Sequence, residues 1–192
     1  MLRPVRRRRS PTRPACTAGR LAKLLDAYAA EPDAVTVDLI LCGPAESERL
    51  LRDGRADVAL LHRPFESTAG STSKSSEGQV VILPAGHPLT VRTHVRSAEV
   101  TELPGLPLPR WPGRDGTYPD GPGPRVRHHA QLLQLIALGR ACCIAHVSAR
   151  DQLLDGLAAV PVLDAPTVTT VIAWPPHSRS RAVAGLVQAA TR

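Results

Sequence analysis

The sequence lacks the patterns that identify membrane and secreted proteins. No apolar run approaches the roughly 18 residues that a membrane span needs, and no apolar run follows the basic start, which argues against a secretory signal. We therefore expect a cytoplasmic protein without a membrane partner. Its 192 residues suit one domain or two small lobes with a hydrophobic core.

Cysteine pairs with the spacing of metal or redox sites are also missing. The four cysteines are Cys16, Cys42, Cys142 and Cys143, and no C-x-x-C pair occurs among them. This pattern fits neither a zinc site nor a disulfide framework. We expect buried free thiols, no metal and no cofactor.

Motifs of catalysis are absent as well. The sequence contains no G-x-S-x-G nucleophile elbow and no P-loop. The neighbouring His128 and His129 would point about 100° apart on a helix, whereas a metal would need histidines at i and i+4. We expect no catalytic residue, and an enzyme is the less favoured class.

Acidic residues are missing from the first 20 residues, which carry seven arginines, four of them in the run Arg6–Arg9. The net charge of +7 belongs to this segment, because residues 21–192 hold 17 basic and 17 acidic side chains. A basic domain would suggest a nucleic-acid partner, but the body of this chain is neutral. We therefore expect no sequence-specific DNA binding by this chain alone.

Helical and strand patterns alternate along the rest of the chain. Apolar residues at helical spacing predict helices, and short β-branched or continuous apolar runs predict strands. Serine, glycine and proline predict loops at 66–78 and 112–124. The alternation of helix and strand indicates an α/β protein with parallel sheets. Helices are expected at 17–31, 45–54, 97–101, 125–139, 148–156 and 178–192, and strands at 35–42, 56–61, 79–85, 141–147, 157–164 and 168–176.

Three segments resemble, in order, the effector-binding domain of LysR-type transcriptional regulators. "LLRDGRADVALL" (50–61) resembles the family's l-x-x-G-x-x-D-v-a-l signature. "VVILPAGHPL" (80–89) looks like its crossover strand and the HPL turn that follows. Residues 131–166 resemble its v-x-x-G-x-G-i-a-l-l-P … l-x-x-g-L-x-x-v-p-l segment. The match runs over roughly residues 17–190.

The resemblance implies a two-lobed fold of the type 2 periplasmic-binding-protein kind, with mixed, mainly parallel sheets and flanking helices. It places a small effector, typically an organic acid or metabolite, between the lobes, where strand ends and helix N-termini suit an anion. By position it implies these effector-binding residues: Ala15, Cys16, Thr17, Gly43, Pro44, Ala45, His62, Pro109, Arg110, Trp111, His128, His129, Ala145 and His146. Arg110 would pair with a carboxylate and Trp111 would cover an apolar face.

The resemblance also sets the expected domain boundaries. Residues 17–82 with 170–192 would form lobe I and residues 83–169 lobe II, while residues 1–16 would be a basic, disordered or non-native segment. The family's first core strand should fall at about Arg9–Pro14, where "RSPTRP" is poorly suited to a central strand. We expect the family's winged helix-turn-helix to be missing from this chain, and a frame-shifted start is one explanation.

Several readings of the function remain open at this stage. The favoured one is the sensor domain of a LysR-type regulator, which controls transcription when joined to a DNA-binding domain, as a homo-oligomer or in a mixed oligomer. The alternatives are a stand-alone small-molecule binding protein of the same fold, a truncated inactive remnant, or an enzyme.

Overall fold

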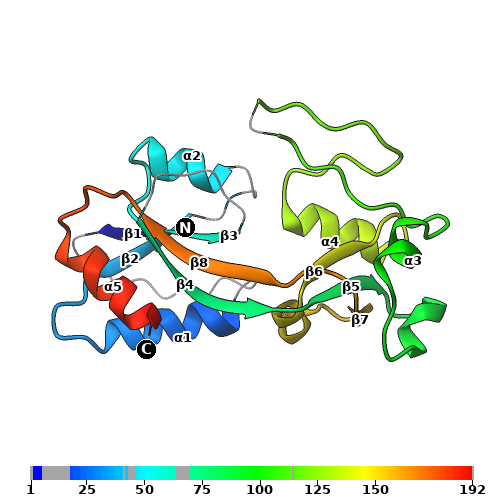
Figure 1. Cartoon of the computed structure of the whole chain (residues 1–192), viewed down its shortest axis with the longest axis horizontal. Helices are drawn as coiled ribbons and strands as arrows, with labels where there is room; N and C mark the ends of the chain where they lie inside the picture. Colours follow the sequence, from blue (N-terminus) through cyan, green and yellow to red (C-terminus); the bar gives the residue numbers. More distant parts are fainter. Residues whose placement is uncertain are drawn as a thin grey trace. The chain divides into compact units, whose positions relative to one another are not determined.

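The computed structural model describes residues 2–5, 18–40, 42, 46–63, 70–113 and 115–191. They form two compact units (Figure 1). Unit 1 comprises residues Met1–Ser76 and Thr169–Arg192, and unit 2 comprises Glu77–Val168. The first boundary lies ahead of the expected one at 82, because the strand over residues 79–84 pairs within unit 2.

Unit 1 is built from two helices, a short third helix and two small sheets. The helices are α1 (Ala18–Ala29), α2 (Glu46–Arg52) and α5 (Arg181–Thr191). One sheet has β8 (Val168–Trp174) between β3 (Ala59–His62) and β4 (Gly70–Glu77). The other pairs β1 (Leu2–Val5) with β2 (Thr36–Leu39).

The core of unit 1 forms where the apolar face of α1 meets α5. The helical spacing of Leu21, Leu24 and Tyr28 puts all three on one buried face of α1. They pack with Val183 and Leu186 of α5, which lies beside α1 in Figure 1. The expected amphipathic pattern of the first and last helices is therefore what holds this unit together.

Unit 2 has one sheet, with β5 (Gln79–Pro84) between β6 (Cys143–His146) and β7 (Leu157–Val162). The helices are α3 (Ser97–Thr101) and α4 (His129–Ala137), with 3-10 turns η1 (Pro88–Val91) and η2 (Val147–Gln152).

Both faces of β5 are buried, so its alternating side chains join two cores. Val80 and Ile82 pack with Ile136 of α4. Val81 and Leu83, on the opposite face, pack with Val100 of α3 among other residues. This explains why the strand reads as a continuous apolar run rather than an alternating one.

The expectation of mainly parallel sheets is wrong for these strands. β3 pairs antiparallel with β8, and β5 pairs antiparallel with both β6 and β7. In the sheet of unit 2, β5 lies between β6 and β7, which both follow it in the sequence and run in the opposite direction. Helix–strand alternation in the sequence does not reveal this order.

Two expected irregular segments also contain strands. Residues 70–77 form β4, although the serine-rich segment predicts a loop, because pairing along a sheet edge depends on neighbours more than on intrinsic propensity. Leu2–Val5 form β1, within the segment that we expected to be disordered or non-native; the edge of a two-stranded sheet tolerates Pro4. Residues 6–17 lie outside the described residues.

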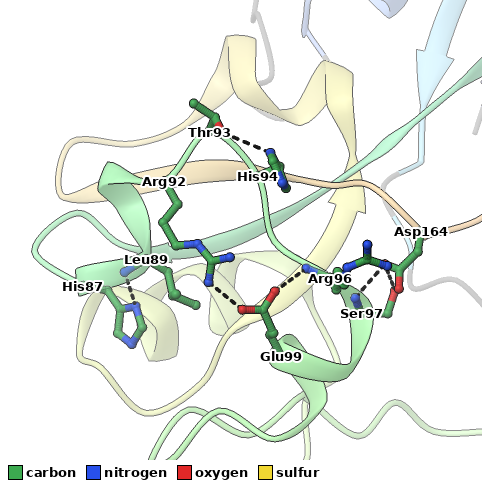
Figure 2. A network of polar contacts seen from close by, with 9 residues as sticks. All are labelled: His87, Leu89, Arg92, Thr93, His94, Arg96, Ser97, Glu99 and Asp164. Atoms are coloured by element: carbon green, nitrogen blue, oxygen red, sulfur yellow. Dashed lines mark hydrogen bonds and ion pairs between the residues drawn. The ribbon is translucent and has the colours of Figure 1, made fainter.

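A polar network fixes the entry to α3 in unit 2 (Figure 2). The Glu99 carboxylate accepts a hydrogen bond from the Arg92 side chain and one from the backbone N–H of Arg96. Asp164 accepts from the N–H and hydroxyl of Ser97, at 2.7 and 3.0 Å. The bond from Arg92 lowers the pKa of Glu99, and the bonds from Ser97 lower the pKa of Asp164. These surface contacts tie η1 and α3 to the end of β7.

The loop before α4 depends on a glycine. Gly123 is buried, and a Cβ atom added there would lie 1.7 Å from the carbonyl oxygen of Leu108. We expect Gly123→Ala to lower the free energy of unfolding by about 2 kcal/mol or more, since the backbone must shift to admit the methyl group. Urea unfolding followed by circular dichroism measures this.

Gly86→Ala is the matched control, because a Cβ there would meet no atom within 4 Å. Equal stability of the two variants would contradict the close approach of the backbone at Gly123.

Candidate functional site

The residues with the most functional potential in unit 2 gather where α4 begins. His128 is extended (φ −134°, ψ 144°) and provides the N-cap position, but its side chain makes no capping hydrogen bond. The helix therefore starts without a side-chain cap on its first amides. Such amides, together with the helix dipole, favour an anion.

The ring of Trp111 lies against the ring of His129 at this helix start. Their centroids are 5.0 Å apart, and the planes are inclined by 42°. Trp111 is placed by the backbone, because Arg110 and Arg125 form a parallel bridge between the segments that flank the loop. The pair offers a flat apolar surface beside an imidazole.

His146 adds a second imidazole from the end of β6. Its position is fixed by the ladder, in which His146 pairs with Gln79 of β5. Partial removal from water lowers the pKa of His129, and the charge of His146 lowers it further. The charge of His146, 17 positions further along the sequence, therefore acts on the ring of His129.

The Gly- and Pro-rich segment before α4 is held in place by its own contacts. Arg110 Nε donates to the carbonyl of Gly123 at 2.6 Å, and its Nη1 donates to that of Pro119 at 3.2 Å. The guanidinium of Arg125 lies 5.5 Å from the centre of the Tyr118 ring. Arg110, expected to pair with a ligand carboxylate, thus gives two of its five donors to the loop.

Of the other residues expected at the site, His62, Pro109 and Ala145 are described, and six lie outside the described residues. In unit 1, His62 ends β3 and is exposed, and its Nδ1 lies 3.2 Å from Thr170 Oγ1 of β8. Pro109 and Ala145 are half-buried in unit 2, and Ala145 packs against the core under α4. Ala15, Cys16, Thr17, Gly43, Pro44 and Ala45 lie outside the described residues.

Two polar residues near His146 were not anticipated from the sequence. Glu77 accepts hydrogen bonds from the Ser148 N–H at 2.7 Å and from the Ser148 hydroxyl at 3.2 Å. Glu77 fell in the expected loop over residues 66–78. The only sequence signal for it was its position directly before an apolar strand.

Comparison with known proteins places this fold in a family. The model of the LysR substrate binding domain matches residues 12–192. The chain belongs to the LysR substrate-binding domain family. The two-lobed α/β class expected from the sequence is thereby confirmed. None of the curated proteins matches the chain.

Solved structures of LysR-family domains share the fold at low sequence identity. The BenM effector binding domain with its effector benzoate is 20% identical, with a TM-score of 0.66 over 90% of this chain and 84% of that one. The OxyR regulatory domain C199D mutant from Pseudomonas aeruginosa is 23% identical, with a TM-score of 0.57 over 75% of each chain. The Corynebacterium glutamicum OxyR C206S mutant, H2O2-bound, is 18% identical, with a TM-score of 0.66 over 91% of this chain and 62% of that one.

The two adjacent buried thiols of this LysR-family domain, Cys142 and Cys143, are poorly suited to redox chemistry. Burial raises the pKa of Cys142 to about 11, and burial together with the neighbouring Cys142 raises that of Cys143 to about 12. Cys42 is half-buried, with its Sγ 3.2 Å from Ser47 Oγ. Within the described ranges, no three His, Cys, Asp or Glu side chains are grouped so as to hold a metal ion.

We expect Cys142 and Cys143 to resist alkylation in the native protein. At pH 8 about one part in a thousand of Cys142 is thiolate, the reactive form. N-ethylmaleimide labelling followed by peptide mass mapping, with and without urea, measures this. Labelling of both residues in native protein as fast as in urea would contradict their burial.

His129 should make the domain less stable in acid. Its folded-state pKa is lowered, so the unfolded chain binds the proton more readily, and stability falls as pH drops through the unfolded value near 6.5 toward the folded one. We expect unfolding free energy to fall less between pH 7.5 and pH 5 in His129→Gln than in the wild type. Urea titrations at each pH measure the slope.

His177→Gln, in the exposed segment before α5, controls for the substitution itself. An unchanged pH slope in His129→Gln would show that the ring is not withdrawn from water.

Proposed function

We propose that this chain is the effector-sensing domain of a LysR-type transcriptional regulator and that it binds a small organic anion. Membership of the family supports the sensing role. In this proposal the domain performs no catalysis. Joined to a DNA-binding domain in the cytoplasm, it controls transcription by favouring one arrangement of an oligomer when the effector is bound.

The observation that carries the proposal for the ligand is the grouping of Trp111, His129 and His146 around the start of α4. An indole face binds a flat apolar body. Imidazoles and the first amides of α4 supply donors for a carboxylate. These features together favour a planar organic acid, and benzoate, the effector named for the BenM domain, is the first compound to test.

Arg110 has a different role in this proposal from the one expected. Its bonds to Gly123 and Pro119 shape the loop that presents Trp111, so its loss would act on the loop as a whole. His128, exposed at the N-cap position, lies beside the helix amides and stays among the proposed contacts. His62, which belongs to unit 1, and Pro109 stay predictions from the sequence.

No helix of the described residues is long and apolar enough to cross a bilayer. The experiment uses the purified chain. A thermal-shift screen of benzoate and other small carboxylates should find compounds that raise the melting temperature, because a ligand at 100 times its dissociation constant stabilises by about 2.7 kcal/mol.

Trp111→Ala and His146→Gln should each lose most of that shift, while His177→Gln should keep it. A ligand whose shift survives in both site variants would contradict the proposed position. Turnover of any stabilising compound would contradict the sensing role.

A further inference from the structure

Glu77, Ser148 and His146 form a continuous polar chain in unit 2, and of these three Glu77 and Ser148 lie outside the residues proposed to contact the effector. Glu77 ends β4, His146 ends β6 and Ser148 lies in η2. The carboxylate of Glu77 accepts hydrogen bonds from both the backbone N–H and the hydroxyl of Ser148. Ser148 Oγ lies 3.5 Å from His146 Nδ1, at the long end of hydrogen-bond distance.

The backbone holds these three groups in register. Gln79 pairs with His146 in the β5–β6 ladder, and the N–H of Val147 donates to the carbonyl of Gly78 at 3.0 Å. The ends of β4 and β6 are thereby kept side by side. The geometry of the polar chain therefore follows from main-chain pairing and does not depend on long flexible side chains.

The number of available protons determines which atom donates and which accepts in the two hydrogen bonds of the Ser148 hydroxyl. An ionised carboxylate can only accept, so Ser148 Oγ–H is drawn to Glu77, the shorter and charge-assisted contact. Ser148 Oγ must then accept from His146 Nδ1–H. In its neutral form, His146 would carry its proton on Nδ1 and its lone pair on Nε2.

The neighbours of the two histidines differ. Glu77 reaches His146 through Ser148 from the end of β4, whereas His129 stacks on the uncharged ring of Trp111. The carboxylate therefore acts on His146 through the hydroxyl of Ser148.

We infer that Glu77 and Ser148 are positioning residues that hold neutral His146 in its Nδ1–H form and so fix the orientation of its ring at the proposed effector site. Because Nε2 then carries a lone pair in the free protein, a carboxylate bound beside the ring would bring a proton onto Nε2, so affinity for a carboxylate would rise as pH falls. Only this link to affinity rests on the proposed function; the tautomer belongs to the free protein.

Long-range 1H–15N correlation spectra of the histidine rings, recorded on the ligand-free full chain at pH 8, test the tautomer. In the wild type, His146 Nδ1 should resonate as a protonated nitrogen and Nε2 as an unprotonated one. In Ser148→Ala and Glu77→Gln, His146 should shift toward the Nε2–H form, because its Nδ1 partner is lost or no longer oriented.

Glu102→Gln, the same change of charge on an exposed residue after α3, should leave the His146 signals unchanged. An Nε2–H tautomer in the wild type would overturn the inference, and so would an Nδ1–H tautomer that survives in Ser148→Ala. The wild-type spectrum decides even if Glu77→Gln fails to fold.

A failed effector screen would leave the tautomer result standing, and a wrong tautomer would leave the proposed effector site standing, so the two failures are distinguishable.

Discussion

The burial of β5 on both faces is the constraint on which unit 2 depends. Val80 and Ile82 complete the core under α4, while Val81 and Leu83 complete the core on the side of α3. Since one strand belongs to both cores, neither core can rearrange without the other. The strand also pairs on both edges, with β6 and with β7, which leaves it almost no freedom to shift register.

The candidate site follows from that fixed strand. The register that pairs Gln79 with His146 sets the end of β6, and the packing of Ile136 against Ile82 sets the axis of α4 and so the position of its first residue, His129. Trp111 completes the group through the bridge beside it. Functional side chains here occupy element ends, while the apolar interiors of the same elements supply rigidity.

The sequence was most informative where local pattern and burial agree. The apolar run at 79–85 predicted β5, because a strand buried on both faces gives a continuous apolar run. The apolar spacing within 125–139 predicted α4, because an amphipathic helix gives a periodic pattern. The sequence did not predict β4, whose pairing along β8 is long-range and needs no apolar signature. The antiparallel order of β6, β5 and β7 was also missed, because it depends on pairing between strands far apart in the sequence.

The site was predictable only in part. The resemblance to the family indicated Trp111, His129 and His146. The stacking of Trp111 on His129 and the effect of the His146 charge on the His129 pKa depend on long-range packing around the start of α4, which the sequence does not show. Glu77 and Ser148 are separated by 71 positions, so no local spacing could link them. The bonds of Arg110 to its own loop likewise arise from a turn whose shape the composition does not specify.

The central claim is that the start of α4 and the end of β6 form the contact surface for an anionic effector. Hydrogen–deuterium exchange with and without saturating benzoate tests it most directly. The account predicts slower exchange concentrated at residues 128–133 and 143–148, with little change at η1 and α3. Protection by benzoate that spares both of those segments and falls elsewhere in unit 2 would contradict it.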